Sequence, residues 1–267
     1  MHPPSVVLHK LNFRYGNDLI FEGFNWEVKP EETWSVIGPS GCGKSTLLYL
    51  LAGLRQPTAG QLLVSGAPAP RPRASTGLIL QNHGLLPWAT VWENAALGVR
   101  MGHFYARKGS NVDGTRPYPP QLPFSVVEEW LERLGIAHLR DRYPGQISGG
   151  QQQRVAITRT LALQPDLLLM DEPFSALDAT TREGLQELVV ELQSELDVTT
   201  IVVTHNIEEA SFLGRKILVL DTPPNRTMSI VENPGAGAPH YRSSAEFLRI
   251  TQTLREHLRH AAHETEV

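Results

Sequence analysis

The sequence predicts an α/β fold with a mostly parallel sheet, an antiparallel β-layer and an inserted helical subdomain. Apolar runs at residues 167–172, 199–205 and 216–221 have the length and composition of buried strands. Between the first two runs, apolar residues recur at helical spacing: Leu185, Leu188, Val189, Leu192 and Leu196. A strand, a helix and a second strand in this order favour parallel pairing.

We expect residues 1–267 to form a single domain. Its core would comprise about 5–84 and 155–235, with a helical subdomain at about 85–154 between them. Within that subdomain, residues 100–123 are rich in Gly, Pro, Tyr and charge, which predicts a surface loop.

Several further elements follow from local patterns. Residues 6–15 and 24–28 alternate or cluster apolar residues and β-formers, which predicts two strands of an antiparallel layer. Residues 62–65 and 76–81 read as strands, and residues 126–134 as an amphipathic helix.

The C-terminal part of the chain predicts one more helix, at about 243–260. Phe247, Ile250, Leu254 and Leu258 would form one face, with three arginines on the other side. Such a helix could touch lipid, but docking on the protein's own core is the favoured reading.

The composition excludes several classes of protein. A net charge of −4 gives no basic surface of the kind that nucleic-acid-binding domains carry. No apolar run approaches the roughly 18 residues of a membrane span, and the N-terminus lacks the apolar core of a secretion signal. Cys42 is the only cysteine, so intramolecular disulfides are impossible. We therefore expect a cytoplasmic protein that binds no nucleic acid.

A glycine-rich loop joins a buried strand to a helix, and the chain is organised around it. Residues 36–50, VIGPSGCGKSTLLYL, fit the pattern G-x-x-x-x-G-K-[ST]. Glycines allow backbone N–H groups to curl around a phosphate, and the helix starting near Lys44 points its positive dipole end at the same anion. The loop predicts a P-loop NTPase core that binds a nucleoside triphosphate through Gly38, Pro39, Ser40, Gly41, Cys42, Gly43, Lys44, Ser45 and Thr46.

Two neighbours of this loop leave alternatives open. Tyr15 ends the first strand, where an aromatic ring could stack on an adenine or simply pack on the fold. The thiol of Cys42, beside Lys44 and a helix start, is either activated or merely small enough to fit.

Two carboxylates at the end of a buried strand predict the chemistry. Asp171 and Glu172 follow four apolar residues, which places them at an exposed strand end. Asp171 is the expected Mg²⁺ partner, either as a direct ligand or through another ligand of the ion, and the Ser45 hydroxyl is placed to bind the ion directly. Glu172 would polarise the attacking water, a role worth about 10²- to 10⁴-fold in rate.

The segment ISGGQQQR at residues 147–154 resembles the signature motif of ATP-binding cassette (ABC) ATPases. Other motifs of that family occur in order over nearly the whole chain: Gln81 after a core strand, a D-loop ending at Asp178, and a switch histidine at His205. The resemblance implies that Gln81 helps to hold Mg²⁺ and the water, and that His205 contacts the γ-phosphate. Departures from the family pattern are Ile147 in place of Leu, and Glu31-Glu32 in place of a glycine-containing turn.

The signature segment opens a helix, so it is a second anion-binding helix start in a chain that already has one phosphate loop. The family resemblance implies that two copies of the chain form a head-to-tail homodimer when ATP binds. In that dimer Ser148, Gly149, Gly150 and Gln151 of one subunit cap the γ-phosphate held by the other subunit.

The resemblance favours a transporter subunit. Residues 84–98, GLLPWATVWENAALG, are similar to the nitrate, sulfonate and taurine importer group, and in the family this region receives the membrane subunit. It implies separate transmembrane permease subunits, indirectly an extracytoplasmic solute-binding protein, and a peripheral place on the cytoplasmic face of the inner membrane. An ATPase for lipid or lipoprotein export or extraction, or a soluble ABC ATPase without a transport role, remains an alternative.

Overall fold

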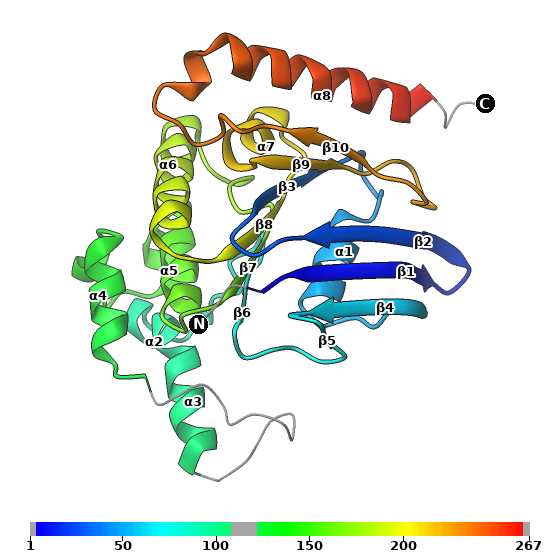
Figure 1. Cartoon of the computed structure of the whole chain (residues 1–267). Helices are drawn as coiled ribbons and strands as arrows, with labels where there is room; N and C mark the ends of the chain where they lie inside the picture. The colour runs from blue at the N-terminus through cyan, green and yellow to red at the C-terminus, as the bar shows by residue number, and fades with distance from the viewer. Residues whose placement is uncertain (1–3, 108–121, 264–267) are drawn as a thin grey trace. The chain divides into compact units, whose positions relative to one another are not determined.

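The structure is a computed structural model in which residues 4–107 and 122–263 are described (Figure 1). The chain divides into two compact units. The first unit comprises Met1–Arg73, Asp166–Glu172 and Gln186–Val267, and the second comprises Ala74–Pro165 and Pro173–Leu185. Each unit is therefore assembled from segments that are distant in sequence.

An antiparallel sheet forms one layer of the first unit. Its strands follow the order β2-β1-β4-β5, with β1 at Val6–Tyr15, β2 at Asp18–Val28, β4 at Ala59–Val64 and β5 at Ala67–Pro68. The pairing of β1 with β2 shifts register between Leu8 and Leu11. This irregularity moves the buried face of β1 from Val6 and Leu8 to Leu11 and Phe13.

A largely parallel sheet forms the other layer of the first unit. Within the unit its strands follow the order β10-β9-β3-β8-β7. Their bounds are β3 at Thr33–Ile37, β7 at Leu167–Asp171, β8 at Thr199–Val203, β9 at Lys216–Val219 and β10 at Ser229–Glu232. Neighbouring strands from β9 to β7 run parallel, and only β10 is antiparallel. All residues of β3, β7 and β8 are buried, as expected for the parallel core that the apolar runs predict.

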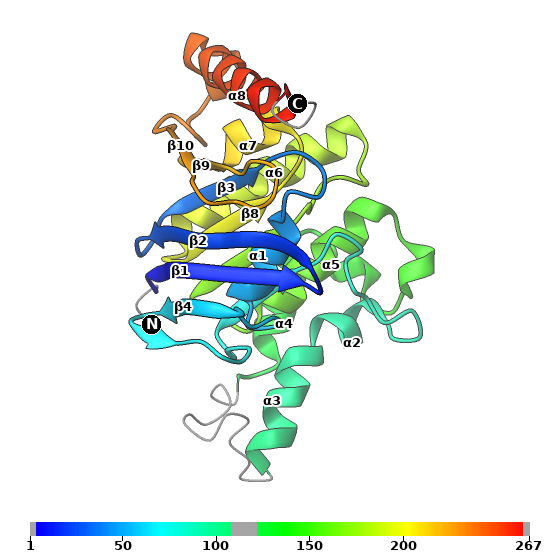
Figure 2. The same ribbon diagram turned by 90° about the vertical axis from the view of Figure 1, so that its right-hand side faces the viewer.

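Three helices pack on these strands. Helix α1, Lys44–Leu51, contacts β7 and β8, and α7, Ile207–Leu213, contacts β3 and β8. Helix α8, Ala245–His263, lies over α7 and β9 in Figure 2 and follows the short η3, Tyr241–Ser243. Its apolar face is buried against the core at Phe247, Ile250 and Leu254. The expected docking of this helix on the domain's own core is therefore confirmed.

The second unit is mostly helical. It contains β6 at Thr76–Ile79, α2 at Val91–Ala95, α3 at Leu97–Arg107, α4 at Ser125–Arg133, η1 at Ala137–Leu139, η2 at Pro144–Gln146 and α5 at Gly149–Leu161. Helix α6, Ala179–Glu195, begins in this unit and continues into the first. Across the described ranges 4–107 and 122–263, no helix is long and apolar enough to cross a membrane.

Three expectations about element boundaries differ from the structure. The surface loop expected at 100–123 begins too early, because α3 continues to Arg107; residues 108–121 lie outside the described part of the chain. Residues 97–107 contain several helix formers, and each of the two glycines, Gly98 and Gly102, costs a helix only about 1 kcal/mol. The expected boundary at 154/155 falls inside α5. Strand β2 starts at Asp18 rather than Phe24, and Gly23, at a φ of 61°, lies in its interior.

Candidate nucleotide site

The carboxyl edge of the parallel sheet brings together the phosphate loop, Glu172 and His205. Gly38 directly follows β3, Glu172 directly follows β7, and His205 comes two residues after β8. Because β7, β8 and β3 are adjacent and parallel, their carboxyl ends meet at one edge. Ligands of open α/β sheets bind at this edge.

The phosphate loop has two positions at which only glycine fits. A Cβ on Gly38 would lie 2.6 Å from Cys42 Sγ and 2.7 Å from the carbonyl oxygen of Leu220. Gly43 has a φ of +106°, and a Cβ there would lie 2.6 Å from a methyl carbon of Ile20. The loop backbone at these two positions therefore packs closely against neighbouring atoms, and glycine is required for the curvature of the loop.

The ammonium group of Lys44 lies inside this loop. Its Nζ donates hydrogen bonds to the carbonyl oxygens of Gly38 at 2.9 Å and Pro39 at 2.8 Å. Lys44 is also the first residue of α1, and no side chain caps the N-terminus of that helix. The first N–H groups of a helix have no acceptor within it. A charged donor and uncapped N–H groups converge here, as the binding of a phosphate chain requires.

The burial of Cys42 decides whether its thiol is activated or the residue is merely small enough to fit. The residue is fully buried, and this burial raises the pKa of its thiol, although nearby Lys44 acts in the opposite direction. A raised pKa keeps the sulfur as an unreactive thiol at neutral pH. Activation is therefore not supported, and Cys42 acts as a small buried residue beneath the loop.

Asp171 lies under the start of α1 and is only 5% exposed. Ser45 Oγ donates a hydrogen bond to its Oδ1 at 3.1 Å. Burial raises the pKa of Asp171, and the hydroxyl groups of Ser45 and Tyr49 oppose that rise. The influence of Tyr49 on this carboxylate was not predicted, because Tyr49 in the sequence resembles an ordinary packing residue of the helix.

Glu172 is held in an unusual backbone conformation at the end of β7. Its φ is 45°, in the left-handed region, and its backbone N–H donates to the carbonyl oxygen of Val203 at 2.8 Å. Its carboxylate Oε1 lies 3.1 Å from Nδ1 of His205. The side chain of Glu172 is 20% exposed and that of His205 is 60% exposed. The structure thus brings the expected base and the expected switch histidine into direct contact, with solvent access from the histidine side.

Asn225 is a second residue that sequence reasoning missed. It is buried, and its Nδ2 donates to the carbonyl oxygen of Cys42 at 2.7 Å and of Ile20 at 3.2 Å. Its Oδ1 accepts from the backbone N–H of Asp221 at 3.0 Å. This amide fixes the phosphate loop against β2. No local pattern signals the role, because Asn225 lies in an irregular loop far from the loop it supports.

Tyr15 lies at the end of β1 and is 41% exposed. Its ring makes an edge contact with Phe13, and the guanidinium of Arg55 lies 5.7 Å from its centroid. One face of the aromatic ring therefore has a cation near it, and the exposure leaves room for a stacked base.

The remaining candidates lie in the second unit. Gln81 is exposed just beyond β6 and donates a hydrogen bond to Ser175 Oγ at 3.3 Å. Arg159 of α5 donates to the carbonyl oxygens of His83 and Gly84 at 2.6 and 2.7 Å. Those contacts fix the segment that follows Gln81.

The signature segment forms the N-terminus of α5. Ser148 is the N-cap; its hydroxyl accepts from the N–H of Gln151 at 3.3 Å, and the Gln151 side chain accepts from the N–H of Ser148 at 2.9 Å. Ser148 and Gly149 are exposed, whereas a Cβ on Gly150 would lie 2.3 Å from Cγ2 of Thr181. Gly150 is therefore required for the close approach of α5 and α6, and the two residues before it remain accessible.

Asp178 belongs to the same unit and is exposed. It directly precedes α6, and its Oδ1 accepts a hydrogen bond from the backbone N–H of Thr181 at 3.0 Å. That hydrogen bond lowers the pKa of Asp178, so the carboxylate is charged at the helix start.

An apolar cluster precedes α2. Trp88 is 74% exposed, Pro87 is exposed, and Leu85 and Leu86 are half-buried. The amide of Asn94, fully buried, bonds to the N–H and carbonyl of Leu86 and to the carbonyl of Ala89. The loop is therefore internally fixed while the largest aromatic ring on it points to solvent.

The Glu31-Glu32 pair, a departure from the expected glycine-containing turn, keeps the turn's backbone geometry. Glu31 has a φ of 65°, which glycine adopts at less cost. Glu32 accepts hydrogen bonds from Lys216 Nζ at 2.7 Å, Trp34 Nε1 at 2.7 Å and Lys29 N–H at 2.9 Å. The turn is thus held by side-chain bonds of Glu32.

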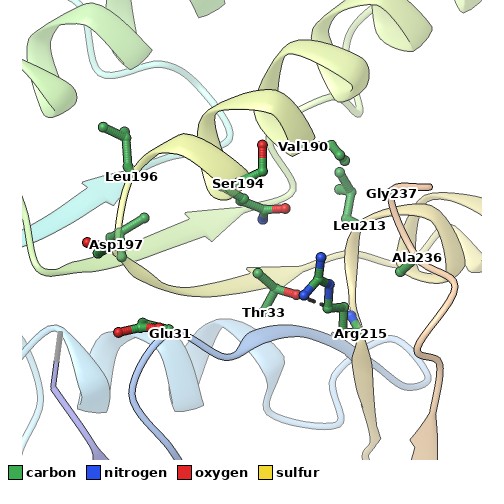
Figure 3. Close-up of a pocket in the computed structure, with 12 residues that line it drawn as sticks. Glu31, Thr33, Val190, Ser194, Leu196, Asp197, Leu213, Arg215, Ala236 and Gly237 are labelled. Carbon is green, nitrogen blue, oxygen red and sulfur yellow. Dashed lines mark hydrogen bonds between the residues drawn. The ribbon is translucent and has the colours of Figure 1, made fainter. Parts of the chain in front are cut away.

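A pocket of about 290 Å³ lies at the opposite edge of the sheet (Figure 3). Thr33 at the start of β3, Val198 just before β8 and Arg215 just before β9 all line it. A five-residue strand spans roughly 17 Å, so this pocket is separate from the phosphate loop. It is not the candidate nucleotide site.

The phosphate loop between β3 and α1, with Asp171 and Glu172 at the end of β7 on the same edge of the sheet, defines a P-loop nucleoside triphosphatase. A family model described as ABC transporter matches residues 21–175, more than half of the chain. The chain belongs to the ABC transporter family.

Named relatives agree with this assignment. The aliphatic sulfonates import ATP-binding protein SsuB of Bacillus cereus is 36% identical over 239 residues, covering 90% of this chain and 88% of that protein. The nitrate transport protein NasD of Klebsiella oxytoca is 38% identical over 236 residues, covering 88% and 86%. The bicarbonate transport ATP-binding protein CmpC of Synechocystis is 40% identical over 234 residues, but the chain spans only 33% of that longer protein.

A solved structure with the same fold is a dimeric post-hydrolysis state of the ATP-binding cassette MJ0796 bound to ADP and Pi. It aligns with a TM-score of 0.68 at 29% identity, covering 84% of this chain and 97% of that one. The chain is therefore an ATP-binding, ATP-hydrolysing subunit of an ABC transporter, in the importer-like group.

Proposed function

We propose that this subunit powers the import of a small solute, of the nitrate, sulfonate or taurine type, through separate membrane subunits. The observation that carries the proposal is the similarity along most of the chain to the ATP-binding proteins of nitrate and sulfonate systems. The subunit would lie at the cytoplasmic face of the inner membrane, and an extracytoplasmic solute-binding protein would deliver the solute to the complex.

In the proposed reaction, Glu172 is the base that polarises the attacking water. His205 orients the Glu172 carboxylate and contacts the γ-phosphate. The 3.1 Å contact between these side chains supports the pairing. Lys44 and the loop N–H groups from Gly38 to Thr46 would bind the phosphate chain, and Tyr15 would stack on the adenine. Most of the catalytic effect in such sites comes from positioning and charge stabilisation.

The donor set around Asp171 fits Mg²⁺. This ion prefers oxygen ligands and is usually bound through one or two carboxylates together with substrate phosphates. Asp171 and the Ser45 hydroxyl supply such oxygens, and no cluster of three or more His, Cys, Asp or Glu suited to a metal occurs among the described residues. When bound, Mg²⁺ would neutralise charge on the phosphates. Gln81 remains a predicted further ligand.

We infer a head-to-tail homodimer for the working state. Ser148 and Gly149 are exposed at a helix N-terminus, which suits them to the γ-phosphate of a nucleotide held by another subunit. The dimeric state of the related cassette supports dimerisation as such. Gln151 and the D-loop residue Asp178 would lie in the same contact.

The test is transport by the complete complex. We would purify this chain with its permease subunits, reconstitute them in proteoliposomes with ATP on the side of the ATPase, and add the solute-binding protein and labelled nitrate or taurine outside. ATP-dependent uptake that is lost in a Glu172→Gln complex is the expected result. ATP-driven extraction of lipid or lipoprotein without uptake of either solute would contradict the proposal and favour an exporter.

A further inference from the structure

The pocket in Figure 3 belongs entirely to the first unit and lies at the amino edge of its parallel sheet. Its volume of about 290 Å³ is close to the lower end of the range for small-molecule sites, roughly 300–1,000 Å³. Residues at or just before the starts of β3, β8 and β9 line it, together with Gln193 and Ser194 from the last turn of α6. None of the residues that line it belongs to the candidate nucleotide site. ATP binding therefore leaves this pocket without a role.

Three charged side chains line the pocket: those of Glu31, Asp197 and Arg215. Two of these residues are held through their backbones. The N–H of Glu31 donates to Thr199 Oγ1 at 3.1 Å, and the N–H of Arg215 donates to Thr33 Oγ1 at 3.3 Å. Across the described part of the chain, none of the three charged side chains makes an ion pair or a hydrogen bond of its own. These charges are therefore available to a ligand.

The positive and negative charges lie in different parts of the pocket. Figure 3 shows the guanidinium of Arg215 above Thr33, whereas Glu31 and Asp197 lie apart from it on the left of the view. A guanidinium matches the geometry of a carboxylate or a sulfonate, and carboxylates form strong hydrogen bonds with an ammonium group. Helix α6 ends at Glu195, two residues before Asp197. The carboxyl end of a helix also favours a cation.

The amide of Gln193 is a second observation that points to a ligand. Gln193 lines the pocket, and its Nε2 is buried without a hydrogen-bond partner. A buried donor that stays unpaired costs stability. The last torsion of a glutamine side chain has a broad energy minimum, so the amide can turn and donate to an acceptor in the pocket. An acidic group bound near Arg215 would supply that acceptor.

The backbone at Glu31 is the third observation. Its φ of 65° lies in the left-handed region, which glycine adopts at less cost. The neighbouring Glu32 accepts three hydrogen bonds that hold the turn, but the side chain of Glu31 accepts none among the described residues. Unfavourable backbone conformations of this kind are concentrated at functional sites. The fold itself does not require a glutamate at this position.

We propose that this pocket binds a small zwitterion, an amine and an acid joined by a short carbon chain. The acidic group contacts Arg215 and Gln193, and the ammonium group contacts Glu31 and Asp197. The inference goes beyond the proposed function and does not rest on it, because the pocket lies within this subunit and at the opposite edge of the sheet from the phosphate loop.

The test is binding to the full-length subunit alone, without permease subunits and without nucleotide. We would titrate glycine, β-alanine and taurine by calorimetry, with propionate and ethylammonium as probes that each carry one of the two charges. At least one zwitterion should bind one site per chain with a dissociation constant on the order of 1 mM. The singly charged probes should bind at least about 10-fold more weakly. No saturable binding of any zwitterion up to about 50 mM, or equal binding of a singly charged probe, would overturn the proposal.

Two variants locate the binding. Arg215→Gln removes the cation and should raise the dissociation constant of the zwitterion about 10-fold. Glu31→Gly removes a carboxylate and at the same time relieves the left-handed backbone. It should weaken binding about 10-fold while the melting temperature stays equal to or rises above that of the parent protein. A lower melting temperature would show that the Glu31 side chain supports the fold, and would overturn its role in binding.

Glu191→Gln is the matched control. Glu191 is an exposed carboxylate near the same end of α6, but it does not line the pocket. Its dissociation constant for the zwitterion should stay within about twofold of the parent value. Zwitterion binding that is unchanged in both Arg215→Gln and Glu31→Gly would place the ligand elsewhere on the subunit and overturn the proposal.

Discussion

His205 Nδ1 lies 3.1 Å from Glu172 Oε1. The two residues follow adjacent parallel strands, because β7 and β8 pair in register up to Asp171 opposite Val203. The backbone of Glu172 is left-handed where the chain leaves β7. This strained conformation occurs where the proposed chemistry needs a fixed carboxylate, and strain of this kind clusters at functional sites.

The contact predicts a specific effect of His205→Ala. Without the imidazole, Glu172 loses the group that orients it, and the γ-phosphate loses a contact. We expect kcat to fall about 10²-fold while ATP affinity measured by calorimetry changes little. A loss of binding with unchanged kcat would show that His205 holds the nucleotide in its ground state instead.

A second prediction concerns Trp88. Its 74% exposure on an internally fixed loop indicates a partner surface, so Trp88→Asp should reduce copurification with the permease and transport. ATP binding by the isolated subunit should be unchanged. Leu248→Asp is the control, because Leu248 is 66% exposed on α8 and should tolerate a charge. Normal transport by the Trp88 variant would refute the assignment.

The Glu32 cluster predicts a pH-dependent contribution to stability. Burial alone would raise the pKa of Glu32, but hydrogen bonds from Lys216, Lys29 and Trp34 lower it below the ordinary value of 4.5. A lowered folded-state pKa adds stability above pH 4.5, and this stability is lost as pH falls through the folded-state value.

Glu32→Gln should therefore cost about 1–2 kcal/mol in the free energy of unfolding at pH 7, measured by urea denaturation. The difference from the wild type should shrink below pH 4.5. The control is Glu22→Gln, which breaks an exposed pair with Arg226 and should cost less than about 0.5 kcal/mol. A pH-independent difference for Glu32→Gln would exclude the ionised carboxylate as its cause.

The shared site predicts that nucleotide binding and dimerisation can be separated. In the Glu172→Gln background, ATP should produce a dimer on gel filtration and ADP should leave a monomer. Adding Ser148→Arg blocks the helix N-terminus that must approach the partner's γ-phosphate. The double variant should bind ATP with nearly unchanged affinity and remain monomeric.

Ser148→Ala controls for the lost N-cap, which costs about 1 kcal/mol. That variant should still dimerise with ATP, because its side chain is small. If Ser148→Arg abolished ATP binding by the monomer, the signature helix would belong to its own subunit's site, and the head-to-tail model would be wrong.

The core of the first unit was predictable because its signals are local. The fully apolar runs of β3, β7 and β8 and the glycine-rich loop each specify one structure on their own. The later part of α3 was missed, because residues 100–123 are rich in Gly, Pro, Tyr and charge, which predicts a loop. The hydrogen bond from Asn225 to Cys42 could not be predicted, because the two residues are separated by 183 positions.

Steady-state hydrolysis by Glu172→Gln tests the central claim, that this chain hydrolyses ATP with Glu172 as its base. The substitution keeps the shape of the side chain and leaves Lys44, Ser45 and Asp171 in place. We predict ATP binding within about twofold of the wild type and a fall in kcat of about 10²-fold or more, measured by phosphate release. Hydrolysis within about threefold of the wild-type rate, with the nucleotide bound, would contradict it.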